Sequence, residues 1–158
     1  GIEDFNRGEE YFIFHENDKD IGCVAYESTR ADTAYLNRLS VLSSHQNKGI
    51  GEKLVSHIFT YSKEKKHSHV SIGIIANNLQ LKNWYLKLGF HEKVTKHLEH
   101  LPFDVTNMNY KLKVPIHLTQ EHTKLNLLFK TQQTNFSRTK NKSRRDMNYI
   151  PVATYNIA

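Results

Sequence analysis

Residues 43–51 read Ser-Ser-His-Gln-Asn-Lys-Gly-Ile-Gly and have the residue types of an anion-binding loop. Backbone amides in such a loop, together with the amino end of a following helix, can hold a phosphate group, and glycine lets the backbone approach it closely. The spacing is neither the Gly-x-Gly-x-x-Gly of dinucleotide-binding folds nor a P-loop ending in Gly-Lys-Ser/Thr, which disfavours nucleotide-dependent dehydrogenases and NTPases. Gly49 and Gly51 alone would also suit an ordinary turn at the start of a helix.

The segments on either side predict the elements that position this loop. Residues 11–14 and 21–26 are β-rich and flank a polar turn, so we expect a hairpin, and residues 34–42 predict a third strand. Apolar residues at three-and-four spacing then predict an amphipathic helix from residue 50 to about residue 65. Residues 70–75 predict a buried strand, which should run parallel to the third strand because a helix connects the two.

A second, shorter helix is expected after the buried strand. Asn77 and Asn78 are good N-cap residues for it, and Gly89 lies where a glycine ends a helix. Residues 90–98 and 105–112 predict two more strands. Residues 114–158 contain no glycine, and seven basic against two acidic side chains there account for most of the formal net charge of +6. We expect a marginal helix over residues 118–129 and then a flexible, basic tail.

Two motifs, in this order, resemble those of the GNAT N-acetyltransferase superfamily. Leu39-x-Val41 followed by Gln46-x-x-Gly49-x-Gly51 is similar to the family's motif A, and Asn78 followed by Tyr85-x-x-x-Gly89-Phe90 is similar to its motif B. The resemblance spans about residues 11–113 and is nearest to small bacterial members. It implies an α/β fold of the GNAT acyl-CoA N-acyltransferase type, with a mixed, splayed β-sheet flanked by helices. It also implies acetyl transfer from acetyl-CoA to a primary amine.

The resemblance assigns roles to particular residues. The pyrophosphate of CoA would bind the loop amides of Gln46, Asn47, Lys48, Gly49, Ile50 and Gly51. The pantetheine arm would lie in the splay of the sheet, paired with the backbone of Leu39, Ser40 and Val41 and hydrogen-bonded by Asn78. Tyr85 would donate a proton, or a hydrogen bond, to the departing thiolate in a direct attack without a covalent intermediate. A Tyr packed with its hydroxyl on a backbone carbonyl is the alternative, and Trp84 beside it is predicted as a core residue.

The sequence identifies the base that deprotonates the amine less clearly than it identifies the CoA-binding loop. A lysine-like amine has a pKa of about 10.4 in water, so it must lose a proton before it attacks. Many relatives place a Glu or His on the strand before motif B, but the matching position here is Gly73. Glu27, Glu99 and His100 belong to segments expected to border the acceptor. We favour Glu99 or His100, and an ordinary surface position is the alternative for each of the three.

Several features limit the remaining function classes. Cys23 has apolar neighbours, which predicts a buried and unreactive thiol, and a single cysteine suits a reducing cytoplasm. No apolar run approaches the ~20 residues of a membrane span, so we expect a soluble protein. The ten histidines lack the spacing of a zinc site, so no metal is expected. Lys48 could add positive charge near the pyrophosphate, or be an exposed lysine without a role.

Family members normally begin with a strand and two helices, which the residues before the first predicted strand are too few to supply. We therefore expect an N-terminally shortened acetyltransferase domain at residues 1–113 and a basic extension at residues 114–158. An exposed sheet edge would favour a homodimer. The acceptor amine could belong to a metabolite, a polyamine, an antibiotic or a protein. Two rival interpretations are a non-catalytic CoA-binding module and a nucleic-acid-binding protein that acts through its basic tail.

Overall fold

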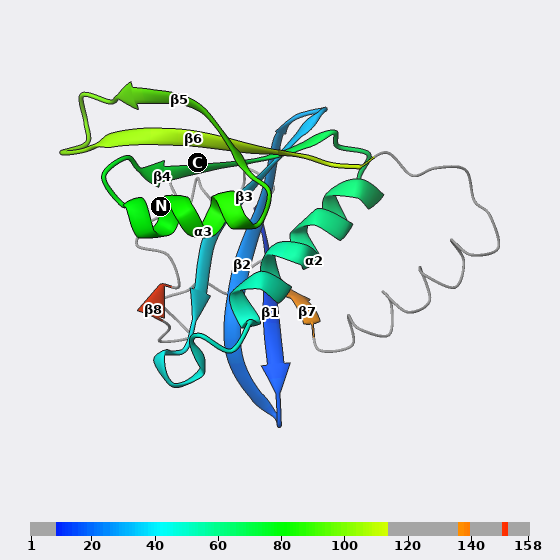
Figure 1. Cartoon of the computed structure of the whole chain (residues 1–158). Coiled ribbons are helices and arrows are strands. Elements are labelled where there is room, and N and C mark those ends of the chain that lie inside the picture. Colours follow the sequence, from blue (N-terminus) through cyan, green and yellow to red (C-terminus); the bar gives the residue numbers. More distant parts are fainter. Residues whose placement is uncertain (1–8, 114–135, 140–149, 152–158) are drawn as a thin grey trace.

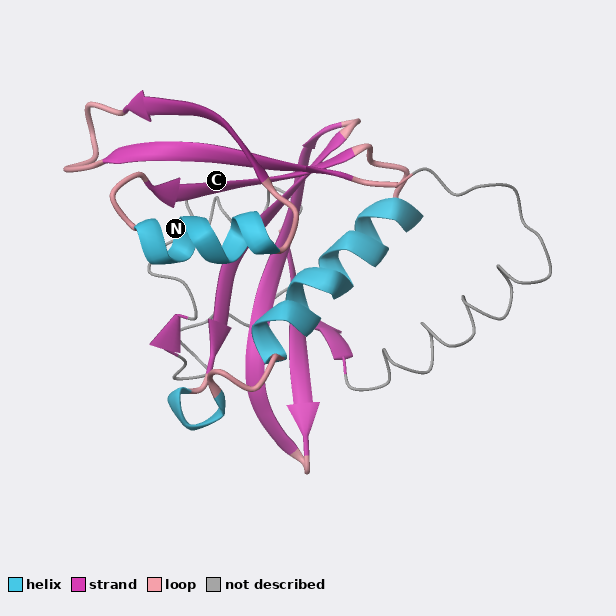
Figure 2. Cartoon of the chain, in the orientation of Figure 1, coloured by secondary structure: helices cyan, strands magenta, loops and turns pink. Residues whose placement is uncertain are grey.

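A computed structural model describes residues 9–113, 136–139 and 150–151 of the chain. Figure 1 and Figure 2 show its β-sheet with the two α-helices, α2 and α3, packed beside it. The elements in chain order are β1 (Glu10–Glu16), β2 (Lys19–Arg30), β3 (Thr33–Val41), the 3-10 turn η1 (Ser43–His45), α2 (Ile50–Glu64), β4 (His69–Ile75), α3 (Leu79–Lys87), β5 (His91–His97), β6 (Asp104–Lys111), β7 (Phe136–Thr139) and β8 (Ile150–Pro151). Up to β6, every predicted strand and helix is confirmed.

β1 and β2 form the predicted hairpin. They pair antiparallel from Glu10 opposite Tyr26 to Glu16 opposite Lys19. The turn between them contains Asn17 and Asp18, whose φ angles are 50° and 59°. Positive φ at both central residues is the geometry that matches the twist of two adjoining strands, and Asn and Asp tolerate it better than most side chains.

β3 and β4 separate soon after they pair. Their parallel register runs only from Thr33 opposite His69 to Tyr35 opposite Ser71. β4 then continues beside β6, while β3 stays with β2 until Val41 lies opposite Gly22. Figure 1 shows the two strands running in different directions beyond their short contact. The predicted splay is therefore confirmed, and it opens on the side where the loop of residues 43–51 begins.

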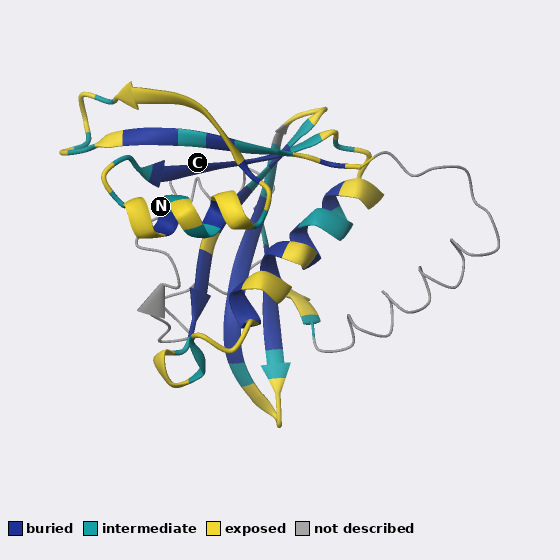
Figure 3. Cartoon of the chain, viewed as in Figure 1, coloured by how far each residue is buried: buried dark blue, intermediate teal, exposed yellow. Residues whose placement is uncertain are grey.

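The hydrophobic core lies between the sheet and the inner faces of the helices. Leu54, Val55 and Ile58 of α2 belong to one buried cluster with residues of the central strands. Figure 3 shows these inner surfaces as buried, whereas β5 is exposed along its length. At the end of α3, Gly89 has a φ of 101°, which confirms it as the predicted helix-ending glycine.

Two segments of the extension pair with the sheet, which corrects the expectation of a flexible tail for these residues. β7 pairs antiparallel with β1 along Tyr11–Phe14, so the edge predicted to be exposed is covered there. The reason is local: Phe136 offers an apolar ring that packs edge-on against Phe14. Arg138, the first residue of the basic run, donates a hydrogen bond to the Tyr61 hydroxyl and lies 3.6 Å from a Glu10 carboxylate oxygen.

β8 pairs antiparallel with β3, with Ile150 opposite Val41 and Pro151 opposite Ser40. It lies on the side of β3 that faces the splay. The predicted helix over residues 118–129 falls outside the described residues. The predicted division of the chain at residue 113 stays a prediction.

Candidate functional site

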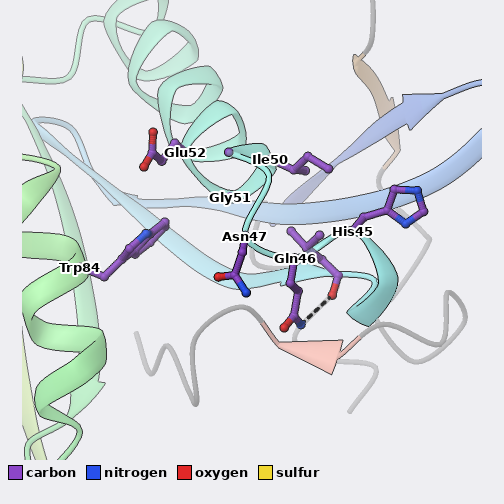
Figure 4. A pocket seen from close by; sticks show the side chains of 9 residues that line it. His45, Gln46, Asn47, Ile50, Gly51, Glu52 and Trp84 are labelled. Atoms are coloured by element: carbon purple, nitrogen blue, oxygen red, sulfur yellow. Dashed lines mark hydrogen bonds between the residues drawn. The ribbon is translucent and has the colours of Figure 1, made fainter.

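A pocket of about 240 Å³ lies at the amino end of α2. Figure 4 shows it enclosed by the loop after β3, the first turn of α2 and a side chain from α3. The residues that line it are Val41, His45, Gln46, Asn47, Gly49, Ile50, Gly51, Glu52 and Trp84. The structure therefore brings together most of the loop that the sequence predicted to bind an anion.

The loop is closed by one side chain and shaped by two left-handed residues. The Gln46 side-chain amide donates a hydrogen bond of 3.2 Å to the Val41 carbonyl, which ties the loop to the end of β3. Asn47 and Gly49 have φ angles of 61° and 79°. A Cβ at Gly49 would meet no atom within 4 Å, so glycine is needed there for its backbone conformation rather than for space.

The first turn of α2 lacks a side-chain cap. Its N-cap is Gly49, which carries no acceptor, although the Gly49 carbonyl accepts the first helical hydrogen bond from the Lys53 amide at 3.1 Å. The amides at the start of a helix have no partner within the helix, and the helix dipole makes this end positive. These amides border the pocket, so the site suits an anionic group.

Three residues that line the pocket, His45, Glu52 and Trp84, were not predicted as binding residues. Trp84 was expected in the core, and it does pack against the core, but it also forms the pocket wall opposite α2. Glu52 lies in the first turn of α2, where it suits the helix dipole but adds negative charge beside an anion site. The sequence gives no signal for the role of Trp84, because this wall forms only when α3 packs beside the splay. Glu52 directly follows Gly51, so its place beside the predicted loop could have been read from the sequence.

Tyr85, the predicted proton donor, is completely buried. Its ring lies edge-on to Trp84 at 4.9 Å and to Phe90 at 5.2 Å, both between ring centroids. It lies in the turn of α3 that carries Trp84, next to the pocket wall. Asn78 caps the same helix, since its side-chain oxygen accepts a hydrogen bond of 3.1 Å from the Leu81 amide. The prediction of Asn78 as an N-cap is therefore confirmed.

Leu39, Ser40 and Val41, the predicted pantetheine partners, lie on β3 beyond its last pair with β4. Their edge faces the splay, as predicted. Two of the three, Ser40 and Val41, are paired with β8. In this structure β8, a part of the chain's own extension, therefore pairs with the backbone that a pantetheine arm would need.

Glu99 and His100, the predicted bases, are exposed on the turn between β5 and β6, and neither lines the pocket. Lys48 is also exposed. Glu27 is partly buried on β2 and accepts a hydrogen bond from the Asn37 side chain. The structure thus places Glu27 on β2 and the adjacent Glu99 and His100 on the turn between β5 and β6.

Cys23 is buried, as predicted, and its thiol lies 3.8 Å from the Arg38 carbonyl. Among the described residues, His, Cys, Asp and Glu side chains form no group of three or more that could hold a metal ion. None of the described helices is both long enough and apolar enough to cross a membrane.

A comparison of the sequence with models of protein families identifies the family of this chain. The family model described as an acetyltransferase (GNAT) domain matches residues 7–92, which is more than half of the chain. The match includes the whole loop of residues 43–51 as well as α2 and α3. No curated protein matches the chain.

Solved structures with the same fold include several acetyltransferases. An acetyltransferase from Bacillus subtilis in complex with CoA has 24% sequence identity and a TM-score of 0.64, over 71% of this chain and 82% of its own. A GNAT family acetyltransferase from Elizabethkingia anophelis with acetyl-CoA bound has 19% identity and a TM-score of 0.61, over 70% and 81% of the two chains. At these identities the likeness shows the fold alone.

Proposed function

The chain belongs to the GNAT acetyltransferase family, and from that premise we propose that it transfers an acetyl group from acetyl-CoA to a primary amine. The observation that carries the proposal is the pocket at the uncapped amino end of α2, bounded by β3 and α3. Helix-terminal amides and a glycine-containing loop are the groups that bind the phosphates of a nucleotide-like ligand. The pyrophosphate of CoA has the matching charge.

The loop residues have two different roles in binding. Gln46 is committed to the Val41 carbonyl, so it holds the loop in shape, while Asn47, Lys48, Gly49, Ile50 and Gly51 present their backbone to the pyrophosphate. The exposed ammonium of Lys48 adds positive charge. The pantetheine arm pairs with Leu39, Ser40 and Val41 and with the Asn78 side chain. Since β8 holds Ser40 and Val41, binding of the arm requires β8 to leave this edge.

The proposed reaction is a direct transfer. The amine nitrogen attacks the thioester carbon, a C–N bond forms, the C–S bond breaks, and the departing thiolate takes a proton from the Tyr85 hydroxyl. The proton that the amine loses passes to Glu99 or His100, which are open to solvent. Burial of Cys23 supports the absence of an acyl-cysteine intermediate, because an apolar environment disfavours the thiolate.

Calorimetric titration of the full chain with acetyl-CoA tests the site. We expect binding by the wild type and a loss of at least about tenfold in Gly49→Trp, whose indole would occupy the pocket. The matched control is Gly49→Asn, because asparagine tolerates a positive φ and adds a smaller side chain. Transfer to a set of primary amines is then measured. A folded wild type that does not bind acetyl-CoA would rule out the proposed function.

A further inference from the structure

Basic side chains gather at the carboxyl end of α2. Backbone hydrogen bonds bring two other segments to this point: the Ser68 amide donates to the Asp32 carbonyl at 2.8 Å, and the Leu112 amide donates to the Ser68 carbonyl at 2.8 Å. Figure 1 shows the corner of the molecule where α2 ends, β4 begins and β6 ends. We call six residues there the basic corner: Arg30, Lys63, Lys65, Lys66, Lys111 and Lys113.

The basic corner carries an excess of positive charge. Its six side chains are exposed, and the same segments (30–32, 63–68 and 111–113) contain two carboxylates, Asp32 and Glu64, which leaves a net charge of +4. None of the six cations forms an ion pair within the part of the chain that the structure describes. These charges repel one another, and an anion that binds among them would relieve the repulsion.

Part of the basic corner forms a row across the sheet. The residues that pair in register along this row are Arg30, Thr33, His69 and Lys111. Their neighbours in the chain belong to the core beneath the helices, so the row lies on the opposite face of the sheet; these neighbours are Ala34, Val70 and Leu112. Lys113, two residues after Lys111, is exposed next to the row.

The length of the row suits a chain of phosphates. Neighbouring strands lie about 4.8 Å apart, so the row spans about 14 Å from Arg30 to Lys111. Each strand of a DNA duplex carries one negative charge per about 3.4 Å of helix axis, so the row faces about four phosphates. The Thr33 hydroxyl already donates to the Asp32 side chain, so Arg30, Lys111 and Lys113 supply the charged donors.

Lys66 occupies a backbone position that favours glycine. It follows the C-cap residue of α2, and its φ angle is 65°. Glycine adopts this left-handed conformation without strain, whereas a lysine there costs stability. The chain therefore keeps a cation at a position where a neutral residue would be more stable. Residues in such strained conformations are concentrated at functional sites.

Stabilisation of α2 does not account for the whole basic corner. Lys63 lies in the last turn of the helix, where a positive charge suits the helix dipole. Arg30, Lys111 and Lys113 lie outside the helix, on the strand ends beside it. The effect of the dipole falls off within the last turn, so these three cations need another explanation.

The basic corner lacks the apolar anchors of a protein–protein interface. Such interfaces depend on a few aromatic or aliphatic side chains, and a stable membrane contact also inserts apolar groups. Among the described residues, the large apolar side chains that are exposed lie on α3 and β5; they are Leu79, Leu86 and Val94. The basic corner therefore binds by charge, and a long polyanion fits it better than a folded acidic protein or a lipid surface.

We propose that the basic corner binds the phosphate backbone of a double-stranded nucleic acid. Contacts to phosphates carry no sequence information, so the binding is independent of base sequence. The site is separate from the proposed CoA pocket. α2 has 15 residues and rises about 1.5 Å per residue, so about 22 Å lie between the pocket at its amino end and the basic corner at its carboxyl end. The inference therefore does not rest on the proposed acetyltransferase function.

Fluorescence anisotropy tests binding of the full chain to a labelled DNA duplex and to an RNA duplex of the same sequence, each of about 20 base pairs. The tighter of the two identifies the kind of nucleic acid. The test variant combines Arg30→Gln, Lys111→Gln and Lys113→Gln. We expect it to bind the duplex at least about tenfold more weakly at about 0.1 M salt, with the slope of log K against log salt lowered by about 2 to 3.

The matched control combines Lys87→Gln, Lys93→Gln and Lys96→Gln, which remove the same charge from exposed positions on α3 and β5. Its affinity for the duplex should change less than about threefold. The basic residues after position 113 are present in both variants, so their contribution to binding is the same.

Lys66→Gly separates the charge of this residue from its effect on folding. Glycine suits the φ angle of 65°, so the melting temperature should not fall, while the loss of one cation should weaken duplex binding by about threefold. Equal affinity of the two triple variants for the duplex, or unchanged affinity in Lys66→Gly, would overturn the inference. So would binding to polyglutamate or to phosphatidylserine vesicles that is as tight as binding to the duplex.

Discussion

Phe136 stacks on His57, with ring centroids 4.2 Å apart and an angle of 10° between the rings. His57 is buried on α2 and also meets the edge of Phe12. Neither of its ring nitrogens has a hydrogen-bond partner within the described part of the chain. Burial lowers the pKa of His57 from 6.5 to about 4, because the charged ring would lose its hydration.

The folded state should therefore lose stability in mild acid. The unfolded chain binds a proton at His57 with a pKa near 6.5, and the folded chain only near 4, so the contribution is complete above pH 6.5 and is lost as the pH falls toward 4. In His57→Phe, which keeps the aromatic packing, the loss between pH 7.5 and 4.5 should be smaller by about 2 kcal/mol. Urea denaturation at the two pH values measures this difference. His91→Phe on the exposed strand β5 is the control, and equal pH dependence in wild type and His57→Phe would contradict the prediction.

Glu52→Gln should strengthen CoA binding. The substitution removes a negative charge from the pocket wall, and an exposed charge pair contributes less than about 1 kcal/mol, so a decrease in Kd of about threefold is expected. The effect should shrink as salt is added, because salt screens exposed charges. Calorimetry at low and high salt measures it, with Glu64→Gln at the other end of α2 as the matched control. Weaker binding in Glu52→Gln would place the phosphates elsewhere.

Tyr85→Phe separates the acid role of this residue from its packing. Phenylalanine keeps the contacts with Trp84 and Phe90 and removes only the hydroxyl. If the hydroxyl protonates the thiolate, kcat should fall by about 10²-fold while the affinity for CoA changes little. Steady-state kinetics and calorimetry measure the two quantities. Tyr110→Phe, in a ring stacked on Phe59, is the control, and an unchanged kcat in Tyr85→Phe would assign Tyr85 to packing alone.

A disulfide between β3 and β8 should block CoA binding. Val41 and Ile150 are directly opposite in an antiparallel pair, where Cα atoms lie about 4.5–5.5 Å apart, a distance that a disulfide can span. The double variant Val41→Cys, Ile150→Cys should bind CoA at least about tenfold more weakly when oxidised than when reduced, because the pantetheine arm and β8 need the same backbone. Cys23 lies opposite Ser40 rather than Val41, and Val41→Cys alone is the control. Equal affinity in both redox states would show that β8 and the cofactor do not compete.

Most of the fold before residue 113 was predictable because its signals are local. The helix spacing of α2, the Asn78 cap and the Gly89 stop each lie within one element, and the structure confirms all three. The splay followed from the family resemblance, since no local pattern shows where two strands part. β7 was missed because its partner β1 is distant in the sequence and Phe136 is a single apolar residue in a polar, basic stretch.

The site residues that are neighbours in the sequence were predictable, as in the loop from Gln46 to Gly51. The site residues that folding brings together from distant segments were not. Trp84 reaches the pocket through the packing of α3, and Glu27 meets Asn37 through the pairing of β2 with β3. The bulge at Arg38 shifts which residues share a face, and a strict alternation of strand residues does not reveal such a shift.

The pairing of β7 with β1 also has a consequence for biosynthesis. Phe14 lies opposite Phe136, so this contact closes a loop that contains most of the chain, and such distant contacts form late and slowly. During translation β1 and β2 leave the ribosome long before β7 does. Until then the outer edge of β1 has unpaired backbone groups and can pair with another nascent chain. β7, which is synthesised long after β1, thus protects the edge of β1 from aggregation.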